Sequence, residues 1–158
     1  MIEINKKVAN FSGDSTSGVF SLAEFQEHSQ GKNLVIFFYP RDNTPGCTTE
    51  SLDFGKLYPE FKKHNAEVIG ISRDTMAAHK KFTDKYEFPF QLVADPNEEI
   101  CNSFGVMKDK NMYGKKVRGI ERSTFIIDKN SILKYEWRKV KIPNHVDEVL
   151  DKIKELNT

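Results

Sequence analysis

The sequence predicts a single α/β domain in which helices flank a central mixed β-sheet. Two patterns predict this class: strand-like apolar segments alternate with helix-like segments over residues 34–104, and a hairpin-like pair of segments and one more helix follow. Alternation favours parallel strands in the middle of a sheet, and a hairpin adds antiparallel strands. The 158 residues fit one domain spanning 1–158 and are too few for two ordinary domains.

The first predicted strand is the uninterrupted apolar run at 34–39, which Pro40 ends. A run of this length without alternation is typical of a strand covered on both faces. A helix is predicted over 47–63, where apolar residues recur near helical spacing. Gly55 and Pro59 fall inside this helix and predict a bend.

The remaining elements are predicted from the same signals, in chain order: strand 66–72, helix 75–86, strand 91–94, helix 95–104, hairpin strands 123–128 and 132–137, and a terminal helix that starts near residue 145. Asp74 or Thr75 is the expected N-cap of the second helix. The basic stretch 108–118 predicts a solvated loop.

Composition narrows the class of protein. Lysine and arginine number 24 and aspartate and glutamate 23, so a formal charge of +1 gives no reason to expect nucleic acid or a membrane as partner. The N-terminus lacks the basic-then-apolar order of a secretory signal, and two cysteines do not indicate a disulfide-stapled fold. A cytoplasmic enzyme is therefore expected. Without metal-ligand spacing or a glycine-rich phosphate loop, no metal and no cofactor are expected. The four histidines, for which no catalytic or ligand role is expected, are His28, His64, His79 and His145.

The chemistry is expected where the first strand meets the first helix. Cys47 follows the end of the buried strand and lies at or near the helix N-terminus. Ligands of open α/β sheets tend to bind at this edge, and free N–H groups and the helix dipole favour an anion such as a thiolate there. A buried structural cysteine is the alternative, and position alone leaves both interpretations open.

The neighbours of Cys47 decide between them. The spacing Pro40–Thr44–Cys47–Glu50, within YPRDNTPGCTTE, resembles the active-site signature of the peroxiredoxins, in particular the PrxQ or bacterioferritin comigratory protein (BCP) subgroup. Further matching segments are GISRDT at 70–75, ADPNEEICNSFGV at 94–106 and GIERSTFIID at 119–128. The resemblance extends from about residue 8 to the C-terminus. It implies a thioredoxin-like fold and a thiol-dependent peroxidase that reduces hydrogen peroxide and organic hydroperoxides in antioxidant defence.

The resemblance also implies a role for each matching residue. Cys47 would attack the peroxide as a thiolate, and Arg122 would lie near the sulfur and donate hydrogen bonds to the peroxide. Thr44 would hydrogen-bond the sulfur or the peroxide through its hydroxyl. Pro40 would limit the access of water, and Glu50 would orient Arg122. Without the family spacing, Thr44 would be read as a turn residue and Arg122 as part of a surface ion pair.

The product would be a sulfenic acid that a second thiol must reduce. Many members carry a resolving cysteine five positions after the first, where this chain has Leu52, and others carry one on the following helix. Cys101 is the only other thiol, and its apolar neighbours favour packing over a resolving role. An external thiol (thioredoxin, glutaredoxin or a low-molecular-weight thiol) is therefore expected to reduce Cys47. A monomer or a weak homodimer is expected.

Two other functions stay open at this point. A thioredoxin-fold disulfide oxidoreductase would share the fold but normally needs C-x-x-C, and Glu50 occupies the second cysteine position. A non-catalytic binding module that has lost turnover is the other, and the joint presence of Thr44, Cys47 and Arg122 argues against it.

Overall fold

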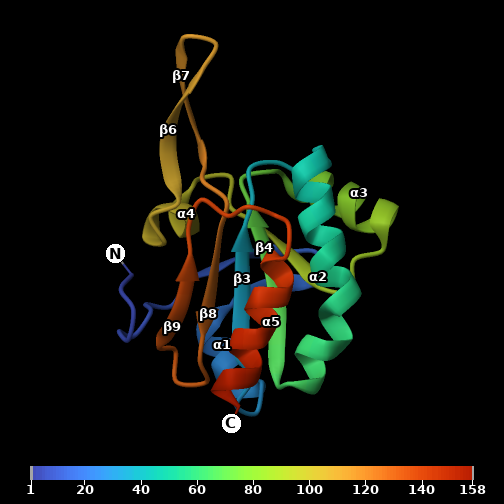
Figure 1. Cartoon of the computed structure of the whole chain (residues 1–158), viewed down its shortest axis with the longest axis vertical. Helices are drawn as coiled ribbons and strands as arrows, with labels where there is room; N and C mark the ends of the chain where they lie inside the picture. The colour runs from blue at the N-terminus through green and yellow to red at the C-terminus, as the bar shows by residue number, and fades with distance from the viewer. Residues whose placement is uncertain (1, 158) are drawn as a thin grey trace.

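A seven-stranded sheet divides the computed structural model, which describes residues 2–157, into two layers of core (Figure 1). The strand order is β2-β1-β5-β4-β3-β8-β9, and β6 pairs with β7 in a separate two-stranded sheet. The strands are β1 (Ser12–Ser15), β2 (Gly18–Ser21), β3 (Asn33–Phe38), β4 (Ala66–Ser72), β5 (Gln91–Ala94), β6 (Met107–Met112), β7 (Lys115–Ile120), β8 (Ser123–Ile127) and β9 (Leu133–Trp137).

The middle of the sheet is parallel and its margins are antiparallel. β4 pairs in parallel with β3 and with β5, whereas β8 runs antiparallel to β3 and forms a hairpin with β9. This arrangement confirms the predicted mixed sheet. Every residue of β3 is buried, as the uninterrupted apolar run predicted.

Helices cover both faces of the sheet. Alternate residues of β3 divide between two cores, because successive side chains of a strand point to opposite faces. Val35 and Phe37 pack with residues of α2, α3 and α5, and Ile36 and Phe38 pack with residues of α1 and α4. No helix within residues 2–157 combines the length and the apolar character needed to cross a bilayer. The helices are α1 (Leu22–His28), α2 (Pro45–Lys63), α3 (Met76–Tyr86), α4 (Glu99–Ser103) and α5 (His145–Leu156).

The ends of the helices depend on local capping. α2 begins at Pro45 rather than at Cys47, because proline fits the first helical position. Thr75 caps α3 by accepting a hydrogen bond from the Ala78 N–H, as predicted. α4 is shorter than the predicted helix 95–104. Asp95 stays outside it and accepts hydrogen bonds from two of its backbone N–H groups.

Two parts of the chain differ from the sequence prediction. Before residue 33 the sequence predicted no element, and the structure has β1, β2 and α1 there. The predicted loop at 108–118 is wrong, because these residues form most of the β6–β7 hairpin. The hairpin projects from the body of the molecule (Figure 1), and its described side chains between residues 108 and 118 are exposed on both faces. A strand without a buried face lacks the apolar alternation by which strands are recognised.

Candidate active site

Cys47 lies in the first turn of α2, directly after the loop that follows β3. Thr44 is the N-cap and Pro45 the first helical residue, and the Thr48 N–H bonds to the Thr44 carbonyl at 2.8 Å. The backbone N–H groups of Gly46 and Cys47 have no partner among the described residues. Such free donors, together with the helix dipole, favour an anion at this place. The Cys47 side chain is buried, with 1% of its surface exposed.

Arg122 joins the sulfur to a buried carboxylate. Its Nη2 lies 3.3 Å from Cys47 Sγ, and its Nη1 lies 2.6 Å from Glu50 Oε1. Arg122 immediately precedes β8, which holds it beside the first turn of α2. A Cβ atom on Gly46 would lie 3.3 Å from Arg122 Nη2, so the glycine permits this close approach. The structure thus brings together three residues that the sequence predicted, Cys47, Glu50 and Arg122.

Glu50 is fully buried and only one of its oxygens is paired. Oε1 accepts from Arg122, and Oε2 has no hydrogen-bond partner among the described residues. Burial raises the pKa of Glu50 from 4.5 to about 7, although the charge and hydrogen bond of Arg122 oppose this shift. Burial acts to lower the pKa of Arg122, but Glu50 and Cys47 outweigh it, and the pKa of Arg122 is raised. The guanidinium therefore stays charged.

Thr44 and Pro40 lie in the segment before α2 and make no hydrogen bond to the sulfur. The Thr44 hydroxyl donates to the Arg41 carbonyl at 3.0 Å, and it makes no cap bond to the helix. A hydroxyl that has donated its proton still has lone pairs with which to accept. Pro40 is half-buried in the loop between β3 and α2.

Cys101 lies in the other layer of core. Cys47 packs with the α2 side of the sheet, whereas Cys101 packs with residues of the α1 and α4 side. Both cysteines are free and buried. Burial, followed by the neighbouring Asp95 carboxylate, raises the pKa of the Cys101 thiol far above its ordinary value. Cys101 is thus a thiol separated from Cys47 by the β-sheet.

A buried hydrogen-bond chain that the sequence analysis missed holds the loop before α2. Asp42, in that loop, accepts from the Tyr39 hydroxyl at 2.6 Å and lies 2.6 Å from His79 Nδ1. His79 Nε2 lies 3.0 Å from the Val93 carbonyl, which can only accept, so Nε2 carries a proton. The chain links the loop to α3 and β5. Asp42 stands inside the matching segment YPRDNT, but nothing in the sequence pairs it with a histidine 37 residues away.

His145 is a second residue that sequence reasoning missed. It begins α5, and its Nε2 lies 2.8 Å from the Thr124 hydroxyl on β8. Burial, and then the charge of Arg122, lower the pKa of His145 to about 4. The ring is therefore neutral at neutral pH.

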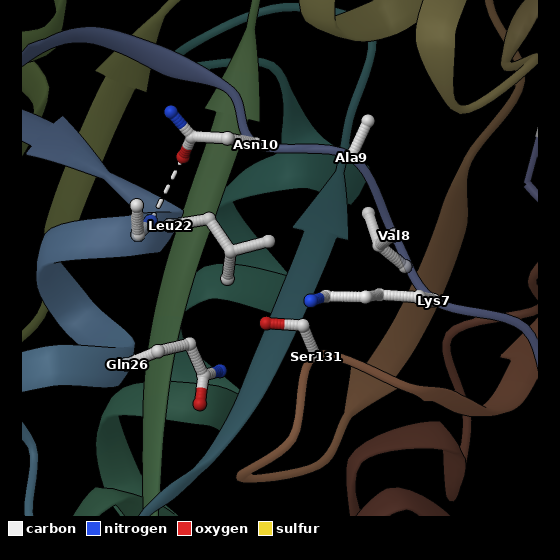
Figure 2. Close-up of a pocket in the computed structure, with 8 residues that line it drawn as sticks. Lys7, Val8, Ala9, Asn10, Leu22, Gln26 and Ser131 are labelled. Carbon is white, nitrogen blue, oxygen red and sulfur yellow. Dashed lines mark hydrogen bonds between the residues drawn. The ribbon is translucent and has the colours of Figure 1, made fainter.

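A cavity lies at another place in the molecule. It measures about 530 Å³ and lies between the N-terminal segment, α1 and the β8–β9 turn. Figure 2 shows the side chains of Lys7, Gln26 and Ser131 around its apolar wall. None of the predicted site residues lines it. Within residues 2–157, no group of three or more His, Cys, Asp or Glu side chains is placed to hold a metal ion.

Comparison with known proteins identifies relatives of the chain. The family model described as "AhpC/TSA family" matches residues 4–136. The peroxiredoxin Bcp of Xanthomonas campestris is 52% identical over 124 residues, which are 78% of each chain.

Solved structures show the same similarity. One is the bacterioferritin comigratory protein of Xanthomonas campestris, studied in trapped intermediate/ligand complexes for its alkyl peroxide reduction activity. It is 44% identical, with a TM-score of 0.85, and the alignment covers 94% of this chain and 92% of that one. Another is a cysteine-to-serine mutant of the PrxQ of Xylella fastidiosa. It is 38% identical, with a TM-score of 0.91, over 100% of this chain and 99% of that one.

Proposed function

We propose that Cys47 is the peroxidatic residue of this chain, which belongs to the AhpC/TSA family and is a thiol-dependent peroxidase of the peroxiredoxin type. We also propose that an external thiol completes each catalytic cycle. The observation that carries the proposal is the contact of Arg122 Nη2 with Cys47 Sγ at 3.3 Å. It places a permanent positive charge beside the sulfur of Cys47, in the first turn of α2.

The first step is a two-electron oxidation of sulfur. The Cys47 thiolate attacks the terminal peroxide oxygen, the S–O bond forms and the O–O bond breaks. Cys47 becomes a sulfenic acid, and the leaving alkoxide or hydroxide takes a proton from solvent to give an alcohol or water. We propose both hydrogen peroxide and organic hydroperoxides as substrates.

The groups around Cys47 stabilise the negative charge that passes from the sulfur to the leaving oxygen in this step. The free N–H groups of Gly46 and Cys47 and the guanidinium of Arg122 donate to the thiolate and to the oxygen that develops charge. The Thr44 hydroxyl, which donates to the Arg41 carbonyl, accepts a hydrogen bond from the O–H of the peroxide, whose proton stays on the oxygen that becomes the sulfenic acid. Pro40 shields the reacting atoms from water.

Glu50 acts through Arg122. Its Oε1 holds Nη1 at 2.6 Å, which leaves Nη2 directed at the sulfur. The arrangement is similar to that of a catalytic base oriented by a third residue, because the Glu50 carboxylate fixes the orientation of Arg122, and Arg122 stabilises the charge on the sulfur. Glu50 is thus a positioning residue.

Reduction follows in two exchanges. A thiol attacks the Cys47 sulfenic acid, a mixed disulfide forms and water leaves. A second thiolate attacks the sulfur of the reductant, which restores the Cys47 thiolate and releases the oxidised reductant as a disulfide. The separation of Cys101 from Cys47 by the β-sheet supports a reductant from outside the chain. Because Cys47 is 1% exposed, the first turn of α2 must move before this reductant reaches it.

We propose thioredoxin, glutaredoxin or a low-molecular-weight thiol as the reductant, a cytoplasmic location, and a monomer or a weak homodimer. The near-neutral formal charge of +1 supports the absence of nucleic acid and membrane from this list.

The experiment is peroxide consumption with dithiothreitol as reductant, using hydrogen peroxide and an organic hydroperoxide in turn. Cys47→Ser should lose turnover, because the hydroxyl is not ionised near neutral pH and is a far weaker nucleophile than a thiolate. Far-UV circular dichroism checks that the variant is folded. Substantial turnover by folded Cys47→Ser would refute the assignment.

A further inference from the structure

The β6–β7 hairpin, Met107–Ile120, forms an arm with one strongly basic face. Residues directly opposite in an antiparallel pair share a face, and the register pairs Lys108 with Gly119 and Lys110 with Val117. The same face carries Lys115, opposite Met112. It holds three lysines, an exposed valine and no acidic residue. This lysine face consists of Lys108, Lys110, Lys115 and Val117.

Part of the charge on the opposite face of the arm is paired. There Asp109 stands opposite Arg118, and Arg118 Nε lies 3.1 Å from Glu98 Oε1 in the segment before α4. By contrast, Lys108 and Lys115 are exposed and form no ion pair with any residue in 2–157. On the opposite face Lys116 is the one exposed lysine without an ion pair among the described residues, so most of the unpaired positive charge of the arm lies on the lysine face.

The tip of the arm exposes an aromatic ring that its turn does not require. Tyr113 and Gly114 connect the two strands, with φ angles of 54° and 79°. A two-residue turn with two positive φ values prefers Asn-Gly, and a bulky residue at the first position is strained. The Tyr113 side chain is 100% exposed. Tyrosine is enriched in protein interfaces, where it supplies apolar area and a hydroxyl.

The arm rises beside the site. It projects past the end of the sheet at which β3 and β4 stop (Figure 1), and α2 follows directly from the loop after β3. At the root of the arm, Ile120 packs into the core on the α1 and α4 side. The lysine face is the opposite face of β7, so its root is directed away from that core. Arg122, two residues beyond the arm, contacts the sulfur.

We propose that the lysine face and Tyr113 dock the reductant of this enzyme, and that this reductant is an acidic protein carrying a dithiol. The inference rests on the proposed function, because it assumes that an external thiol reduces Cys47. A partner of negative charge complements three lysines, and steering by opposite charges raises association rates about 10-fold to 10³-fold. A partner held on the arm is also present at high effective concentration when the first turn of α2 opens.

The test compares two adjacent lysines that are both exposed. Lys115→Glu reverses a charge on the lysine face, and Lys116→Glu makes the same change on the opposite face. The probe is a purified acidic thioredoxin, with excess thioredoxin reductase and NADPH oxidation as the readout. Lys115→Glu should raise the KM for thioredoxin on the order of tenfold in low salt, with the difference shrinking in high salt. Lys116→Glu should change it by less than about twofold, because its charge lies away from the docked partner.

A second variant separates docking from folding. Tyr113→Asn relieves the strained turn, so it should keep or raise the melting temperature while it raises the KM for thioredoxin. All variants should keep wild-type turnover with dithiothreitol, which needs no docking surface. If the wild-type protein itself shows no turnover with dithiothreitol, that result contradicts the proposed function.

Other results would overturn the docking proposal alone. Equal KM values for Lys115→Glu and Lys116→Glu would do so, as would turnover with dithiothreitol but none with the acidic thioredoxin. Concentration-dependent dimerisation that Lys115→Glu abolishes, at unchanged KM, would assign the lysine face to a second copy of the chain instead.

Discussion

The buried carboxylate of Glu50 should make the protein lose stability as the pH rises from about 4.5 to 7. The folded state raises the pKa of Glu50 from 4.5 to about 7, so between these values the folded chain keeps a proton that the unfolded chain has released. The contribution of Glu50 to stability therefore falls with rising pH through this window and stays low above it. One pKa unit corresponds to about 1.4 kcal/mol, so the full effect is roughly 3 kcal/mol.

Glu50→Gln removes this titration while keeping an oxygen that can accept from Arg122. The new amide group faces the unpaired side of the residue and lowers stability by an amount that does not depend on pH. The measurement is the melting temperature of both proteins at pH 4.5 and pH 8. The difference between them should change by about 6–12 °C, in favour of the variant at pH 8.

His145 acts in the opposite direction but cancels in this comparison. Its lowered pKa of about 4 means that the folded state binds fewer protons than the unfolded state, so its contribution to stability rises with pH up to about 6.5. Both proteins contain His145. Glu60→Gln, an exposed change on the same helix, is the matched control and should track the wild type. Melting curves of wild type and Glu50→Gln that move in parallel with pH would refute the reasoning.

Three further predictions address other parts of the site. Arg122→Met should slow peroxide reduction roughly 100-fold in stopped-flow measurements, because it removes a charged donor from the sulfur. Arg118→Met should leave the rate unchanged, and an Arg122→Met rate equal to that of wild type would remove Arg122 from the mechanism. Cys101→Ser should keep most turnover with dithiothreitol, and a rapid intramolecular disulfide in wild type, detected by mass spectrometry, would contradict this. His79→Leu leaves Asp42 buried without its partner, so urea denaturation should show a loss of roughly 3–5 kcal/mol; a loss below about 1 kcal/mol would count against the buried pair.

Much of the fold follows from local sequence patterns. The run at 34–39 has the composition of a strand with no exposed face, and the structure buries all of β3. Thr75 has the side chain and position of an N-cap, and it caps α3. The hairpin arm escaped prediction, because pattern recognition relies on one buried face and the arm has none.

The site could be predicted only in part. Cys47 and Glu50 both lie on α2, so their proximity is a local property of the chain. Arg122 comes from a strand far along the sequence, and its contact with both depends on the pairing of β8 with β3. The link between Asp42 and His79 is equally non-local. Neither residue type alone distinguishes a buried pair from two solvated side chains.

The placement of the two cysteines in separate cores has a kinetic consequence. A chain with a resolving thiol within reach converts its sulfenic acid to an intramolecular disulfide in a first-order reaction, at a rate that does not depend on the concentration of reductant. Here the sheet stands between Cys47 and Cys101, so under the proposed one-cysteine cycle the lifetime of the sulfenic acid depends on the concentration of reductant. A second peroxide molecule competes for the same sulfur and converts it irreversibly to a sulfinic acid. The ratio of peroxide to reducing thiol, rather than the amount of peroxide alone, then determines how long each molecule of the enzyme survives.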